Sequence, residues 1–258
     1  MQMVDWLPIY SELSKDLSLD PAKDAEAGRV LAELLKENPN IEPPEEVMLE
    51  LERIVTDRNV FVLGAGPDLE EELSILISQK QASGDWTAIS SGNDVLITAD
   101  GATSPVMSKG ILPDIIVTDL DGGVEDQIRC VSRGSVMLVH SHGDNVNRLR
   151  SVVPRLHGSV IGTTQVNPYD AGGLFNFGGF SDGDRAAFAA DHFRARSITL
   201  LGFNFSEVAT KLSEGGRRMP ALSPEEERFK FKKLAWANVL LGTIGPPEVK
   251  FFSDSNLY

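Results

Sequence analysis

The stretch Asp114-Ile115-Ile116-Val117-Thr118-Asp119-Leu120-Asp121-Gly122-Gly123 is the most informative part of this chain. Its β-branched run predicts a short buried strand, and the two glycines predict a turn that ends it. In an extended backbone, residues two apart point to the same side, so Asp119 and Asp121 are expected to present their carboxylates to one small volume. Two anions so close repel each other unless a cation lies between them, and carboxylate oxygens suit Mg²⁺. The alternative is a solvated Asp-x-Asp-Gly-Gly turn.

The same arrangement recurs at three other places in the chain. Leu96-Ile97-Thr98-Ala99 leads into Asp100-Gly101, and Val136-Met137-Leu138-Val139 leads into His140-Ser141-His142-Gly143-Asp144-Asn145. A fourth acidic cluster, Ser181-Asp182-Gly183-Asp184-Arg185, enters a helical pattern. In open α/β sheets, ligands bind outside the carboxyl ends of the strands, so these four endings predict a single site.

From Asn59 onward, short apolar runs alternate with helical patterns, which predicts an α/β fold with a mostly parallel sheet flanked by helices. The expected strands are 59–64, 95–99, 114–118, 135–140, 159–162, 198–202 and 248–252, and the expected helices are 68–82, 102–109, 183–195 and 224–241. Residues 1–57 are expected to form a helical N-terminal extension, with helices beginning near Pro21 and Pro44, and residues 58–258 to form the α/β domain. The extension shows no chemistry of its own.

Composition narrows the classes of function. The 258 residues are 41% hydrophobic and carry a formal charge of −14, with scattered Lys and Arg, which argues against a nucleic-acid partner. Cys130 is the single cysteine, so an internal disulfide is excluded and a reducing compartment is indicated. No secretory leader or membrane span is evident, so we expect a cytoplasmic protein without a membrane partner.

Two glycine-containing turns could approach a phosphate. Gly64-Ala65-Gly66 follows the first expected strand and opens a helix, where backbone amides can bind an anion. It lacks the third glycine of a dinucleotide-binding turn and the lysine of a P-loop, so a structural turn is the alternative. Gly215-Gly216-Arg217-Arg218 is a basic loop that could fold over phosphates or remain solvated.

Two histidines and an aspartate lie close together in the sequence and could be metal ligands. Zinc could be proposed at His140, His142 and Asp144, but no closed set of four ligands is evident. We therefore expect His142 and Asp144 to belong to the site as groups that move protons or bind phosphate, and His140 and His157 to be structural.

Taken together, these motifs resemble the archaeal 6-hydroxymethyl-7,8-dihydropterin pyrophosphokinase family. The resemblance covers residues 58–252 and rests on the Gly64-x-Gly66-Pro67, Asp100-Gly101, Pro113–Gly122, His140–Asn145 and Gly178–Arg185 segments. A more distant similarity to the catalytic domain of thiamin pyrophosphokinases also exists. Those enzymes continue Asp-x-Asp with Ser and carry a later Thr-Asp pair, whereas this chain has Gly122 and His142-Gly143-Asp144-Asn145, which agrees with the pterin branch.

The resemblance implies an enzyme that moves diphosphate from ATP to a reduced hydroxymethylpterin with Mg²⁺ and releases AMP. The implied catalytic residues are Asp100, Asp119, Asp121, His142 and Asp144, and the implied metal ligands are Asp100, Asp119, Asp121 and Asp144. ATP would contact Gly64, Gly66, Gly101, Arg217 and Arg218, and the pterin would contact Asn176, Phe177, Gly178, Gly179, Asp182 and Asp184. For the phenylalanines of this last segment, core packing is the alternative.

Two other functions stay open at this point. A metal-dependent glycosyltransferase would also hold a nucleotide-sugar diphosphate through Asp-x-Asp, and a non-catalytic nucleotide-binding regulator would bind ATP without releasing AMP. The pathway, folate or methanopterin synthesis, is open as well, and so is a homodimer.

Overall fold

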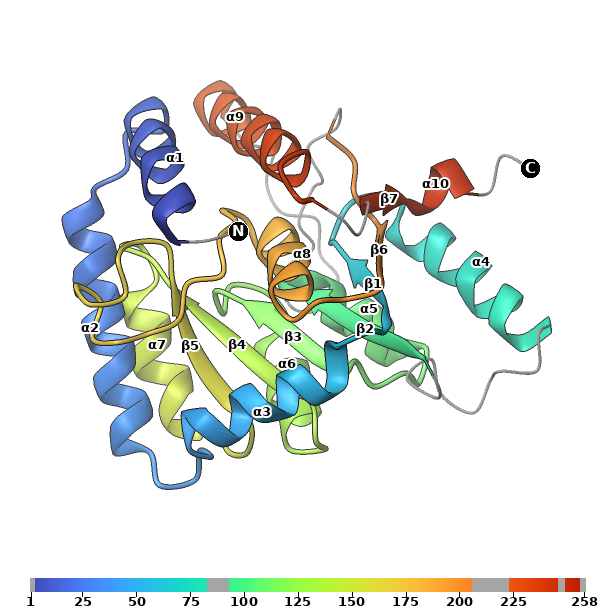
Figure 1. Ribbon diagram of the computed structural model, residues 1–258, viewed down its shortest axis with the longest axis horizontal. Helices are drawn as coiled ribbons and strands as arrows, with labels where there is room; N and C mark the ends of the chain where they lie inside the picture. The colour runs from blue at the N-terminus through green and yellow to red at the C-terminus, as the bar shows by residue number, and fades with distance from the viewer. Residues whose placement is uncertain (1–2, 83–92, 206–222, 246–248, 256–258) are drawn as a thin grey trace.

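The computed structural model describes residues 3–82, 93–205, 223–245 and 249–255. Its centre is a seven-stranded, wholly parallel sheet in the order β5-β4-β3-β2-β1-β6-β7 (Figure 1). The expected α/β fold with helices on both sides of the sheet is confirmed.

Each predicted strand is present, with its ends shifted by one or two residues. The strands are β1 (Asn59–Leu63), β2 (Asp94–Ala99), β3 (Ile115–Thr118), β4 (Val136–Ser141), β5 (Val160–Thr164), β6 (Ser197–Leu201) and β7 (Val249–Phe251). The strands β3, β4 and β5 are buried at every position, as expected for a parallel sheet covered on both faces.

The first strand, β1, lies inside the sheet, and the following strands are added in one direction as far as β5. The chain then returns to place β6 on the other side of β1. The order therefore reverses between β1 and β6, and ligands of open α/β sheets bind outside the carboxyl ends of strands near such a reversal. Asp100, at the end of β2, lies one strand away from it.

One face of the sheet is covered by α3 (Pro44–Val55) and α8 (Asp182–His192). The apolar residues of α3, Val47, Leu51 and Val55, have helical spacing and are buried against the strands, together with the alanines of α8. Small alanine side chains bring α8 close to the sheet, so its first turn lies near the carboxyl ends of the central strands (Figure 1).

The other face is covered by the α-helices α4 (Leu69–Ala82), α5 (Thr103–Ser108), α6 (Val124–Val131) and α7 (Val146–Val152). Two short 3₁₀ turns, η1 (Asp100–Ala102) and η2 (Val153–Arg155), lie on the same face. The short helix α10 (Phe252–Ser255) packs there through Phe252. The sequence did not predict α6 and α7, because each is too short to show a clear helical period.

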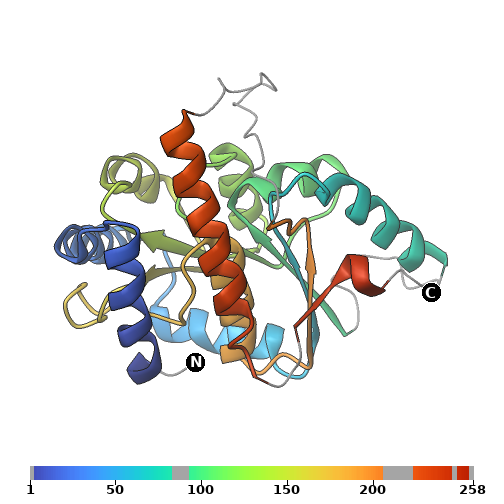
Figure 2. The same ribbon diagram turned by 90° about the horizontal axis from the view of Figure 1, so that it is seen from above.

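Three helices complete the molecule. The predicted α2 (Pro21–Glu37) runs along the β5 edge, and Asp20 caps it through the amide of Ala22. The helices α1 (Met3–Asp16), which was not predicted, and α9 (Pro224–Leu241) lie side by side on the outer surface of α8 (Figures 1 and 2). Asp16 joins α1 to α9 by accepting from Lys232 Nζ and Trp236 Nε1. Among the helices of the described residues, none is long and apolar enough to cross a membrane.

Candidate active site

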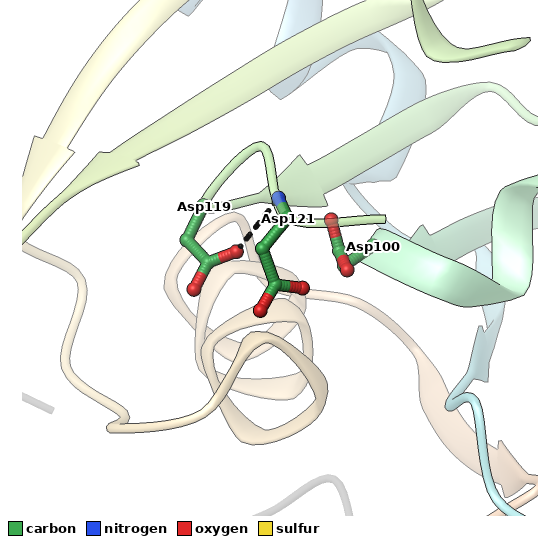
Figure 3. A group of neighbouring side chains, drawn as sticks. All are labelled: Asp100, Asp119 and Asp121. Atoms are coloured by element: carbon green, nitrogen blue, oxygen red, sulfur yellow. Dashed lines mark hydrogen bonds between the residues drawn. The ribbon is translucent and has the colours of Figure 1, made fainter. Parts of the chain in front are cut away.

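Three carboxylates meet at the carboxyl ends of β2 and β3. One oxygen each of Asp100, Asp119 and Asp121 lies within 4.8 Å of the others. Figure 3 shows the three side chains converging from two separate loops, with Asp100 opposite the Asp119–Asp121 turn. The predicted grouping of these three acids is confirmed by this geometry.

The cause that the sequence suggested for this grouping was wrong. The strand ends at Thr118, and Leu120 has a positive φ of 66°, so Asp119 and Asp121 do not lie in extended backbone. The Leu120 side chain is buried at 2% exposure, and the Asp121 amide donates to Asp119 Oδ1 at 3.1 Å. A branched residue at positive φ is uncommon and costs free energy, so packing of Leu120 holds the turn that brings the carboxylates together.

Asp100 is the buried member of the acidic group, with 7% exposure and a φ of 39°. Its Oδ1 accepts from Thr118 Oγ1 at 2.7 Å, the Gly122 amide at 3.1 Å and Gln127 Nε2 at 3.1 Å. A Cβ at position 122 would lie 2.5 Å from Asp100 Oδ2, so glycine is required for the Asp100 carboxylate to fit against this turn. The carboxylate is therefore held in one orientation by the second loop.

Electrostatic repulsion acts on this group. Burial, and after it the charges of Asp119 and Asp121, together raise the pKa of Asp100 from 3.8 to about 6. A carboxyl group with such a pKa carries a free-energy cost when it is ionised at neutral pH. A cation bound among the three carboxylates would remove this cost, so the donor set fits a hard divalent cation such as Mg²⁺.

His142 contacts the acidic group directly. Its Nε2 lies 3.1 Å from Asp119 Oδ2, and its Nδ1 accepts from the Asp144 amide at 3.3 Å. Because Nδ1 accepts, Nε2–H donates to Asp119, so His142 orients this carboxylate. Asp144 is exposed and lies outside the group of three, so its role as a metal ligand stays a prediction.

Asn145 belongs to the His140–Asn145 segment, but the sequence did not predict it as a site residue. Its side chain is fully buried, and Nδ2 donates to the carbonyl oxygens of Asp119 at 3.0 Å and His140 at 2.8 Å. Its Oδ1 accepts from the His142 amide at 3.1 Å. A single amide thus ties the loop after β3 to the loop after β4, which fixes the His142–Asp119 pair.

The N-terminal helices also reach the site. Asp24 of α2 is 4% exposed, and its Oδ1 accepts from the Gly143 amide at 2.8 Å, next to His142. Its Oδ2 accepts from Gln165 Nε2 at 2.7 Å and from the Tyr10 hydroxyl of α1. The interpretation that residues 1–57 contain no chemistry missed this contact with the site, because Gly143 and Gln165 lie more than a hundred residues from Asp24 in the sequence.

Asp182, at the first turn of α8, lies close to the acidic group. Burial, and after it the negative charge of Asp119, raise the pKa of Asp182 well above its usual range. The positive charge of Arg185 lowers this pKa. Arg185 Nη1 donates to Asp182 Oδ1 at 3.1 Å, and Nη2 donates to Gln165 Oε1 at 3.0 Å. The predicted substrate residue Asp182 therefore lies near the acidic group, and its role as a substrate residue stays a prediction.

Other predicted substrate residues have partners within the protein. Asp184 is fully buried and accepts from the amides of Phe180 and Ser181 at 2.7 Å each, as the capping box of α8. Asn176 donates to the Val166 carbonyl, and Phe177 packs in the core against α8. Gly178 and Gly179 both have positive φ, and a Cβ at position 179 would lie 2.6 Å from the Arg185 amide nitrogen.

The glycine turns have structural reasons of their own. The Gly66 amide donates a hydrogen bond to the Gly202 carbonyl oxygen, which joins the ends of β1 and β6. A Cβ at position 66 would lie 2.3 Å from this oxygen. Gly101 lies beside the acidic group, next to Asp100. Contacts of Gly64, Gly66 and Gly101 with ATP stay predictions. Arg217 and Arg218 lie outside the described residues.

Most of the chain matches a protein-family model. The family model described as "6-hydroxymethylpterin diphosphokinase MptE-like" matches residues 31–210, which include the whole acidic group and the first turn of α8. The match begins inside α2, so part of the N-terminal helical segment belongs to the matched region.

Three archaeal relatives are similar over most of their length, and each is named 6-hydroxymethyl-7,8-dihydropterin pyrophosphokinase. The protein of Pyrococcus furiosus is 40% identical over 240 residues, covering 92% of this chain and 94% of the relative. The protein of Methanocaldococcus jannaschii is 35% identical over 244 residues, covering 93% and 95%. That of Methanothermobacter thermautotrophicus is 38% identical over 214 residues, covering 83% of each. The chain therefore belongs to the MptE-like 6-hydroxymethylpterin diphosphokinase family.

Proposed function

We propose that this protein transfers diphosphate from ATP to the hydroxymethyl group of 6-hydroxymethyl-7,8-dihydropterin, with Mg²⁺ as cofactor and AMP as the second product. The observation that carries the proposal is the group of three carboxylates at the strand ends, with the raised pKa of Asp100. Family membership and the names of the relatives support the pterin as acceptor.

Asp100, Asp119 and Asp121 would hold the cation. A cation held there would supply positive charge against the phosphates and against the negative charge that builds up on a leaving nucleotide. A cation bound to the three carboxylates would also explain how a chain with a formal charge of −14 could bind a polyphosphate. Three carboxylates without cysteine favour Mg²⁺ over zinc at this position.

The residues around the acids act by positioning. His142 Nε2–H holds the Asp119 carboxylate, Asn145 holds the two loops together, and Thr118 and Gln127 hold Asp100. Phosphoryl transfer depends mainly on placing reactants and on stabilising charge, so a rigid carboxylate set is what the reaction requires from the protein. The product would be the activated pterin that folate or methanopterin synthesis uses.

The test is the release of AMP. Purified protein is incubated with Mg²⁺, ATP and 6-hydroxymethyl-7,8-dihydropterin, and the nucleotides are separated by chromatography. We expect AMP only when the pterin is present. Asp121→Asn should abolish AMP release, whereas Asp57→Asn, an exposed acid just before the amino end of β1, should not.

Three other outcomes would redirect the assignment. ADP in place of AMP would indicate transfer of a single phosphate. ATP binding without AMP or ADP would favour a regulator. Transfer from a nucleotide-sugar, with no reaction of the pterin, would favour a glycosyltransferase.

A further inference from the structure

Two buried residues each carry a polar atom without a hydrogen-bond partner among the described residues. His140 Nε2 and Arg185 Nε are both unpaired in the described part of the chain, although His140 is 1% and Arg185 8% exposed. Both residues line one small cavity, whose walls also include Thr163, Thr164, Phe177 and Gly178. Buried polar atoms are nearly always hydrogen-bonded, so two exceptions on residues that line one cavity indicate a missing partner.

The cavity is lined in part by the strands that end at the acidic group and at His142. Its wall includes Val117, two residues before Asp119, and His140, two residues before His142. The rings of His140 and His142 stack with centroids 6.4 Å apart, and Arg185 pairs with Asp182. The cavity therefore lies near the ends of β3 and β4, the strands that precede Asp119 and His142.

The hydrogen bonds of His140 fix what its Nε2 can do. Thr163 Oγ1 donates to the Val139 carbonyl at 3.2 Å, so it accepts from His140 Nδ1–H at 3.0 Å. The proton of the neutral ring is then on Nδ1, and Nε2 has a lone pair that can accept a hydrogen bond. Burial lowers the pKa of His140 well below 6.5. The charges of Arg185 and His142 act in the same direction and the Gln165 side chain acts in the opposite one, so the ring stays neutral.

Arg185 presents the complementary group. Asp182 and Gln165 engage Nη1 and Nη2, and Gln165 is held in turn by Asp24. The guanidinium group is thus fixed in orientation while its Nε–H donor lacks an acceptor. The residues that line the cavity offer one acceptor, His140 Nε2, and one donor, Arg185 Nε–H.

We propose that His140 Nε2 and Arg185 Nε bind the edge of a planar heterocycle that carries an N–H donor beside an acceptor atom. Given the proposed function, on which this inference rests, that edge is the 2-amino-4-oxo pyrimidine edge of the pterin. The cavity itself has room for about one water molecule, so only the edge of a ring enters it. His140, which the sequence assigned to a structural role, then becomes a substrate-binding residue.

The test compares two variants with matched controls in the AMP-release assay. His140→Leu removes the acceptor, and Arg185→Lys keeps the positive charge but removes Nε–H. We expect each to raise KM for the pterin about tenfold or more, because a buried partner is left unpaired, and to change KM for ATP less than twofold. The controls His157→Leu and Arg155→Lys make the same substitutions at exposed positions before the amino end of β5.

A second measurement leaves the protein unchanged, so it holds if a variant does not fold. Wild-type protein is assayed with 3-N-methyl-6-hydroxymethyl-7,8-dihydropterin, in which a methyl group replaces the N3–H donor of the pyrimidine edge and the hydroxymethyl group is unchanged. We expect kcat/KM to be at least tenfold lower than for the pterin. Equal values for the two acceptors would overturn the inference, as would an unchanged pterin KM in both folded variants.

Calorimetric titration separates this inference from the proposed function. If wild-type protein releases no AMP but binds the pterin, and His140→Leu weakens binding about tenfold, the binding site stands and the reaction assignment fails. If AMP is released and the variants bind the pterin as wild type does, the reaction stands and this binding site is refuted.

Discussion

Asp100→Asn tests the electrostatic description of the acidic group. At pH 7.5 an ionised Asp100 is destabilising in the metal-free protein, because burial and the charges of Asp119 and Asp121 raise its pKa to about 6. The difference from the ordinary value of 3.8 corresponds to about 3 kcal/mol. The asparagine keeps an oxygen for Thr118, Gly122 and Gln127 and carries no charge, so we expect the variant to be more stable than wild type.

The size of the stability difference between Asp100→Asn and wild type depends on pH. A raised pKa in the folded state gives stability that is fully present below the unfolded pKa and is lost as pH rises through about 6. The advantage of Asp100→Asn should therefore fall below about 1 kcal/mol at pH 4. At about 2–4 °C per kcal/mol, the Tm at pH 7.5 should rise by roughly 6–12 °C.

The assay is thermal denaturation in EDTA at pH 7.5 and pH 4, followed by circular dichroism. Asp57→Asn is the control, because its exposed ion pair with Arg196 contributes little to stability. Adding Mg²⁺ should raise the Tm of wild type and leave Asp100→Asn unchanged. A lower Tm for Asp100→Asn at pH 7.5, or the same shift at both pH values, would refute the reasoning.

Four further predictions follow from the same contacts. Asp119→Ala and Asp121→Ala should each abolish turnover at saturating Mg²⁺ with a small change in Tm, since both lie at a polar rim; steady-state kinetics and denaturation check this. EDTA should stop the reaction and Mg²⁺ should restore it, with zinc a poor substitute in the same assay. Asp24→Asn should cost about 1–3 kcal/mol in urea denaturation and lower kcat, because the Gly143 and Gln165 contacts that hold the His142 loop are weakened. Cys130 should resist iodoacetamide at pH 8 in the native protein and react in urea, as judged by mass spectrometry, because burial raises its pKa to about 11.

The sheet could be predicted from the sequence because its signals are local. Strands such as Ile115–Thr118 are β-branched runs between turn residues, and parallel pairing follows from their alternation with helices. The grouping of Asp100 with Asp119 and Asp121 followed from the rule that the carboxyl ends of parallel strands meet at one edge. No local signal marks Leu120 for positive φ, so the turn that brings the two acids together was not predictable.

Contacts between distant segments account for most of the rest. Asp24 reads as an ordinary exposed helix residue, and only the folded chain places it against Gly143 and Gln165. Asp184 shows the opposite case, because Ser181-x-x-Asp184 is a local capping pattern that was available in the sequence and was interpreted as substrate chemistry. Phe177 belongs to the core, which was the alternative considered for that cluster.

The fate of the β-phosphate tests the central claim most directly. ATP labelled at the β-phosphorus is incubated with Mg²⁺, 6-hydroxymethyl-7,8-dihydropterin and either wild-type protein or Asp121→Asn, and the products are separated. We predict that with wild type the label moves to the pterin in an amount equal to the AMP released, and that with Asp121→Asn it stays in ATP. Label found in ADP, or AMP formed without a labelled pterin, would contradict diphosphate transfer at the site of Asp100, Asp119 and Asp121.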